Sequence, residues 1–255
     1  MNDFLAITDC SGDALCAILD RADQLTDRWV ARDMPLAFEI GARAMGADAS
    51  FVPGDRGIHE PIEDVGHYLG NWFDALLVRS RSHALLESLA RDFPAAVVNA
   101  RTDHNHPCEV LSDLQFVRRR RGSLDGLKVV FAGEVTNLCT SWFEAAVRLP
   151  IQVIQVAPPR YGIDLARLVS LNAGAAGRVS VCHDLESAVE SETDVIYTDC
   201  WPKGPDEQTS GRPSFRPRSA PRRSTGCIPK ASSCPVRLSL AGRKCLQRLC
   251  SRRDA

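Results

Sequence analysis

The sequence predicts an α/β protein with two Rossmann-like domains, each built on a parallel sheet, joined by one long helix. Three observations predict this fold. Short apolar runs alternate with longer amphipathic stretches along the first 205 residues. The runs are apolar throughout, as expected for parallel strands that helices cover on both faces. The alternation falls into two blocks that meet near residues 118–126, which indicates one domain on either side.

The first block contains more predicted helices than strands. Ser11 is a suitable N-cap for the first helix, in which Leu15, Ile18 and Leu19 share one face. Pro35 fits the first turn of the second helix, and Gly46 fits its end. We expect helices at 11–29, 35–46, 61–73, 83–93 and 106–120, and strands at 47–52, 74–80 and 95–100.

The second block repeats the alternation more regularly. Its apolar runs are LKVVFAG, IQVIQVAP, GRVSVC and DVIYTDC, and each of the first three is followed by an amphipathic stretch. We expect strands at 127–133, 151–158, 177–182 and 194–200, and helices at 137–149, 164–173 and 185–192.

The composition is that of a soluble globular protein. Of the 255 residues, 44% are hydrophobic and 25% are charged, and no run approaches the roughly 18 apolar residues of a membrane span. The start MNDFLAITDCSGD lacks the basic and apolar regions of a signal peptide, so we interpret the chain as cytoplasmic and expect no membrane partner. The first six of the ten cysteines mostly lie in apolar stretches, where they act as small buried hydrophobes.

The charge divides the chain near Pro205. Residues 206–255 carry ten Arg and two Lys against three acidic residues, whereas the rest holds 19 basic and 29 acidic residues. We therefore assign domains to residues 1–120 and 121–205, and a disordered basic tail to 206–255. Three interpretations of the tail stay open: an arm that binds nucleic acid or a membrane surface, a functionless extension, and the product of a frameshift. We favour the frameshift and do not expect nucleic-acid binding.

Polar residues gather where the predicted strands end, which is where open α/β sheets bind ligands. The stretch DHNHPCE after the strand at 95–100 could bind a metal, activate a nucleophile or cap a helix. Zinc is disfavoured, because no further Cys or His pair completes a set with His104, His106 and Cys108. We interpret Cys108 as a packing residue. A dinucleotide site is disfavoured too, because GEVTNLC lacks the G-x-G-x-x-G pattern.

At these strand ends the chain resembles the ornithine carbamoyltransferase family, within the aspartate/ornithine carbamoyltransferase superfamily. The matching pieces are FEIGARAMGADASFV, EPIEDVGHYLGNWFDALLVRSRSH, VVNARTDHNHPCEVLSDL, LKVVFAGEVTN, VAPPRYG and DVIYTDCW, in the order the family has them. The resemblance implies two α/β domains and usually a trimer. It also implies transfer of a carbamoyl group from carbamoyl phosphate to the side-chain amine of ornithine, or of a similar amino acid, giving citrulline without a cofactor or a metal.

The resemblance assigns roles to five residues. His106 would donate to the carbonyl oxygen of carbamoyl phosphate, and Arg79 would contact both the carbonyl and the phosphate. Glu109, one turn beyond His106, would accept from the carbamoyl NH2 group. Asn137 and Asp199 would bind the amino acid. Donors aimed at a developing negative charge stabilise the transition state, and Pro107 places His106 at the positive end of a helix.

The chain also departs from the family pattern. The Ser-x-Arg-Thr-Arg phosphate loop and the strand before it have no counterpart in WVARDMPLAFEIG, where Arg32 matches no motif position. Glu109 replaces a glutamine, Leu138 replaces the second residue of an Asn-Asn pair, and Pro202 begins the segment that replaces Ser-Met-Gly. These differences predict a truncated or degenerate member that does not form a stable trimer. Two hypotheses follow: a carbamoyltransferase, and a non-catalytic remnant or a subunit that modulates another protein.

Overall fold

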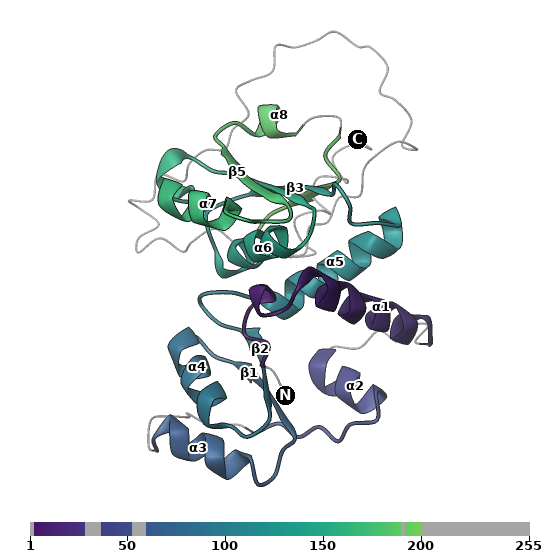
Figure 1. Cartoon of the computed structure of the whole chain (residues 1–255), viewed down its shortest axis with the longest axis vertical. Helices are drawn as coiled ribbons and strands as arrows, with labels where there is room; N and C mark the ends of the chain where they lie inside the picture. The colour runs from purple at the N-terminus through teal and green to yellow at the C-terminus, as the bar shows by residue number, and fades with distance from the viewer. Residues whose placement is uncertain (1–2, 29–36, 53–59, 190–191, 200–255) are drawn as a thin grey trace, which may run out of the picture.

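The computed structural model describes residues 3–28, 37–52, 60–189 and 192–199, and it confirms the α/β fold with parallel sheets. The tail at 206–255 and the segment around Arg32 lie outside these residues. Figure 1 shows one sheet in the lower half of the molecule and the other in the upper half, with α1 (Gly12–Arg28) and α5 (Pro107–Arg121) side by side between them. None of the described helices is long and apolar enough to cross a membrane.

The first sheet has two parallel strands, β1 (Ala75–Arg79) and β2 (Ala96–Arg101). The N-terminal segment lies along the far edge of β2, because Phe4 pairs with Val98 and exchanges backbone hydrogen bonds of 2.9 Å with Val97 and Asn99. The helices of this half, besides α1 and α5, are α2 (Ala37–Ala44), α3 (Ile62–Leu69) and α4 (His83–Asp92), and a 3-10 turn, η1, spans Ile7–Asp9.

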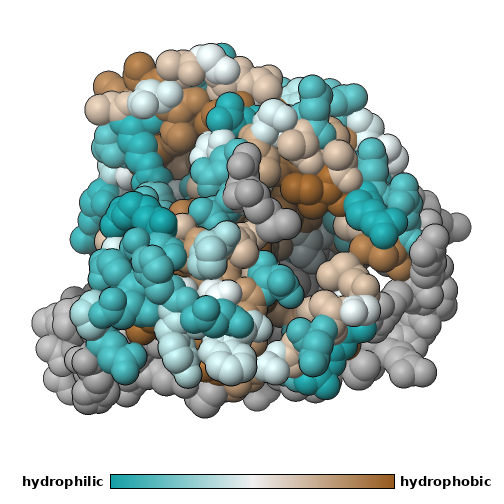
Figure 2. All heavy atoms as spheres, turned by 60° about the horizontal axis from the view of Figure 1, so that its bottom comes forward, coloured by the Kyte–Doolittle hydropathy of each residue, from teal (hydrophilic) through white to brown (hydrophobic). Residues whose placement is uncertain are grey.

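The predicted strand at 47–52 is wrong. These residues form neither a helix nor a strand, and Phe51 is 82% exposed. A strand needs a ladder partner as well as apolar residues, and a short apolar run cannot show whether a partner exists. Beside β1 there is instead a hollow of about 550 Å³, lined by Phe38, Phe51, Phe73 and Leu77 among others. Figure 2 shows this half of the molecule hollowed, with apolar side chains at the surface.

The second sheet has four parallel strands in the order β5-β4-β3-β6. The strands are β3 (Lys128–Ala132), β4 (Gln152–Val156), β5 (Arg178–Cys182) and β6 (Val195–Tyr197). The helices of this half are α6 (Asn137–Arg148), α7 (Leu165–Asn172) and α8 (Leu185–Ala188). A 3-10 turn, η2, spans Pro159–Tyr161. All four predicted strands are present, although α8 ends at Ala188 and β6 at Tyr197, before their predicted ends at 192 and 200.

The helix α5 leads from β2 to β3. It ends at Gly122, whose φ of +89° is a left-handed conformation that glycine adopts without strain. Four arginines fill its last turn, where positive charge favours the negative end of the helix dipole. Three of them also pair with carboxylates of other segments: Arg118 with Asp20 and Asp23, Arg119 with Asp23, and Arg121 with Asp194.

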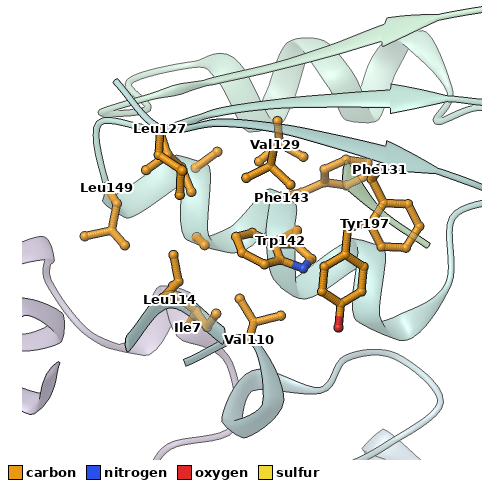
Figure 3. Close-up of a cluster of buried hydrophobic side chains, with 14 of the residues drawn as sticks. Ile7, Val110, Leu114, Leu127, Val129, Phe131, Trp142, Phe143, Leu149 and Tyr197 are labelled. Atoms are coloured by element: carbon orange, nitrogen blue, oxygen red, sulfur yellow. The ribbon is translucent and has the colours of Figure 1, made fainter. Parts of the chain in front are cut away.

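The larger hydrophobic core joins α1, α5 and the second sheet. Its centre is Trp142, which is fully buried with its ring edge-on to Tyr197 at 5.6 Å between centroids. Figure 3 shows Ile7, Val110 and Leu114 on one side of this tryptophan, facing the second sheet's residues on the other. A smaller cluster, which includes Leu76, Leu86 and Val97, packs α3 and α4 against the first sheet. The larger core therefore ties α5, the helix that follows β2, to the second sheet.

Candidate functional site

The turn between β2 and α5 carries the candidate site, and its own hydrogen bonds fix its shape. The backbone N–H of Thr102 donates to the Asn105 carbonyl at 2.9 Å, and the N–H of Asn105 donates to the Thr102 hydroxyl at 3.3 Å. The backbone N–H of His106 donates to the Ser141 hydroxyl on α6 at 2.8 Å. His106 is the N-cap residue of α5, as predicted, and a residue from the second half of the chain holds it there.

His106 and Glu109 lie together, one turn apart on α5. Their Nε2 and Oε2 atoms are 2.8 Å apart, while Nδ1 of His106 is buried and has no hydrogen-bond partner among the described residues. The hydrogen bond from His106 lowers the pKa of Glu109 despite partial burial, and the positive charges of Arg101 and Arg79 lower it further. Glu109 is therefore a stable carboxylate, and it binds Nε2 of His106.

Arg79 lies at the end of β1, beside Arg101, for which the sequence predicted no role. The two residues are Cα partners across the parallel pair, next to an irregularity in register after Val78. Both residues are exposed, and the positive charge of each lowers the pKa of Glu109. One sequence feature indicates a role for Arg101: it directly follows the apolar run AVVNA and comes two residues before DHNHPCE.

Asn137 and Asp199 lie at the ends of strands in the second sheet. The side-chain amide of Asn137 donates to the Thr102 carbonyl at 2.6 Å, so it ties α6 to the turn after β2. The hydroxyl of Thr198 donates to the Ala132 carbonyl at 3.0 Å, which holds the residues after β6 at the end of β3. Burial raises the pKa of Glu134, and the negative charge of nearby Asp199 raises it further. The structure thus brings Asn137 into direct contact with the turn that carries His106, and it places Asp199 near Glu134.

The remaining residues of DHNHPCE have packing and local roles. Burial raises the pKa of the Cys108 thiol to about 11, and this thiol donates to the Asn99 carbonyl at 3.2 Å, which supports the packing interpretation. The ring of His104 lies 4.9 Å from that of His83. Burial and the positive charges of His83 and Arg167 lower the pKa of His104. Within the described residues, no group of three or more His, Cys, Asp or Glu side chains could hold a metal ion.

Two buried carboxyl groups lie behind the turn. Burial raises the pKa of Asp113 and of Glu144 to about 7 each, from ordinary values of 3.8 and 4.5. The hydroxyl of Tyr197 donates to Asp113 at 2.9 Å, and Asn105 donates to Glu144 at 3.1 Å. In the folded chain these groups bind protons up to about pH 7, whereas in the unfolded chain they release them near pH 4.

We therefore expect the free energy of unfolding to fall as the pH rises from about 4.5 to about 7.5, because the folded chain holds more protons in that window. The variant Asp113→Asn keeps an oxygen acceptor for Tyr197 but cannot ionise, so it should flatten this dependence. Exposed Asp125→Asn is the matched control and should leave it unchanged. Urea unfolding at several pH values measures the slope. An unchanged slope in Asp113→Asn would contradict the expected protonation of Asp113.

Comparison with known proteins places the family. Residues 34–119 match the carbamoyl-phosphate-binding domain, and residues 125–216 the Asp/Orn-binding domain, of aspartate/ornithine carbamoyltransferases. The ornithine carbamoyltransferase of Methanoculleus marisnigri is 36% identical over 68% of this chain, and that of Halorhodospira halophila is 33% identical over 79% of it. The chain spans 56% of the first relative and 73% of the second.

A solved structure agrees on the fold. The crystal structure of ornithine carbamoyltransferase from Burkholderia thailandensis superposes with a TM-score of 0.71 at 24% identity, over 80% of this chain and 77% of that one.

Proposed function

The chain belongs to the aspartate/ornithine carbamoyltransferase family, and we propose that it transfers a carbamoyl group from carbamoyl phosphate to the side-chain amine of ornithine or a similar amino acid. One observation carries the proposal. The turn after β2 holds His106 at the positive end of α5, close enough to Arg79 for the two to act on the same carboxylate, Glu109.

The reaction needs donors for two growing negative charges. The neutral amine attacks the carbonyl carbon, a C–N bond forms, and the bond between that carbon and the phosphate oxygen breaks. The amine proton ends on the leaving phosphate. The Nε2–H group of His106 would donate to the carbonyl oxygen once it releases Glu109, and Arg79 would stabilise the carbonyl and the phosphate. Asp199 would hold the amino group of the acceptor.

A second function has its own support. Glu109 occupies Nε2 of His106, and the Asn137 amide is committed to the Thr102 carbonyl. Two groups that would bind substrate thus already have partners within the chain. These contacts favour a non-catalytic remnant, or a subunit that modulates another protein, in which the same side chains serve the fold.

A citrulline assay separates the two functions. With carbamoyl phosphate and ornithine, we expect turnover that His106→Ala lowers by about a hundredfold or more, as for loss of a donor to a developing oxyanion. Exposed His67→Ala on α3 is the matched control and should not change the rate. No citrulline above background from the full chain would reject the enzyme and leave the non-catalytic function.

A further inference from the structure

The end of the first sheet holds guanidinium groups without partners. The side chains of Arg79, Arg81 and Arg101 make no hydrogen bond, ion pair or ring contact within residues 3–28, 37–52, 60–189 and 192–199. Most other arginines in these ranges are engaged. Arg121 binds Asp194, Arg148 donates to the Thr8 carbonyl, Arg167 donates to the Thr140 hydroxyl, and Arg160 lies over the ring of Tyr161. The concentration of free guanidinium groups at one sheet end therefore needs its own explanation.

The strand register places two of these groups beside each other. Arg79 and Arg101 are partners in a parallel ladder, and the backbone N–H of Ser80 donates to the Arg101 carbonyl at 3.0 Å just beyond them. Neighbouring strands lie about 4.8 Å apart, so the two side chains leave the backbone from adjacent points. Like charges on neighbouring strand ends repel each other, and an anion bound by both offsets that repulsion.

The surroundings also favour an anion. The positive end of α5, a helix of 15 residues, is at His106. Arg79 and Arg101 both lower the pKa of Glu109, and this carboxylate is already hydrogen-bonded to His106. Two guanidinium charges thus act on one carboxylate, which leaves one positive charge unmatched. A guanidinium group binds phosphate oxygens through two parallel N–H donors, which suits a tetrahedral dianion.

We propose that Arg101 is a phosphate-binding residue that holds, together with Arg79, the phosphate of the carbamoyl donor at the carboxyl ends of β1 and β2. This inference rests on the proposed function and adds a residue to it. In sequence, the stretch WVARDMPLAFEIG offers no Ser-x-Arg-Thr-Arg run to bind phosphate. Arg101 supplies a second guanidinium from a neighbouring strand instead of from that loop.

The test is calorimetric titration of the full chain with inorganic phosphate, and then with carbamoyl phosphate. We expect Arg101→Ala to weaken phosphate binding about tenfold or more, since a hydrogen bond to a charged group is lost. Arg101→Lys, which keeps the charge but not the paired donors, should fall between Arg101→Ala and the unchanged chain. Arg178→Ala is the matched control, because Arg178 is another exposed arginine without a side-chain partner among the described residues, at the start of β5. Circular dichroism checks that every variant is folded.

The outcomes separate this inference from the proposed function. Phosphate binding that depends on Arg101, in a chain that forms no citrulline, supports the inference and rejects the enzyme. Citrulline formation that depends on His106 but not on Arg101 overturns the inference and keeps the enzyme. Folded Arg101→Ala that binds phosphate as tightly as the unchanged chain overturns the inference, and so does a full chain that binds no phosphate.

Discussion

Trp142→Ala should lower the free energy of unfolding by about 3–5 kcal/mol, the usual cost of removing a buried aromatic side chain. Trp142 is fully buried and lies where α6 meets α5 and the N-terminal turn, between Val110 and Tyr197 (Figure 3). The loss would leave a cavity between the second sheet and the helices that carry His106. Urea unfolding followed by circular dichroism measures the change.

Trp142→Phe is the matched control. The indole Nε1 of Trp142 is buried without a hydrogen-bond partner in the described part of the chain, so replacing the indole with a phenyl ring removes volume but no hydrogen bond. Its cost should be clearly smaller than that of Trp142→Ala, because a phenyl ring leaves a much smaller cavity than a methyl group does. Equal unfolding midpoints for Trp142→Ala and the unchanged chain would show that this core does not hold the two halves together.

Glu109→Gln should tighten the binding of carbamoyl phosphate by about tenfold. At roughly 5 Å and an effective dielectric constant near 20, a carboxylate and one phosphate charge repel by about 3 kcal/mol. Because 36% of the Glu109 side chain is exposed, solvent screens part of this repulsion, and we expect less than the full effect. The amide oxygen of glutamine can still accept from Nε2 of His106, so the change removes the negative charge and keeps the hydrogen bond.

Glu87→Gln is the control for this change. Glu87 lies 3.8 Å from Nε2 of His83, also within a helix, but at a histidine with no proposed role in binding carbamoyl phosphate. Titration calorimetry with carbamoyl phosphate compares the two variants. Tighter binding only in Glu109→Gln identifies Glu109 as the residue that weakens the anion site. Equal binding in Glu109→Gln and the unchanged chain would mean that the anion does not approach α5.

The order of strands and helices could be predicted from the sequence because it depends on local patterns. The runs LKVVFAG and IQVIQVAP are mostly apolar, and each became a largely buried strand of the second sheet. The segment at 47–52 has a similar local pattern but did not become a strand, since a ladder needs a neighbouring strand. Phe4 shows the converse. It lies outside any predicted strand, yet it pairs with Val98, because the edge of β2 that faces away from β1 offers backbone groups for hydrogen bonding.

By itself, the sequence determined the α/β fold and the family, and it placed polar residues at the strand ends, because periodicity and motif spacing are local properties of a chain. Only the tertiary structure decided which of those residues meet. It joined His106 to Glu109, turned Asn137 toward Thr102, and set Arg101 beside Arg79. The physical reason is that charge pairing and hydrogen bonding depend on distances of a few ångströms, and the packing of α5 and α6 and the register of β1 and β2 set those distances.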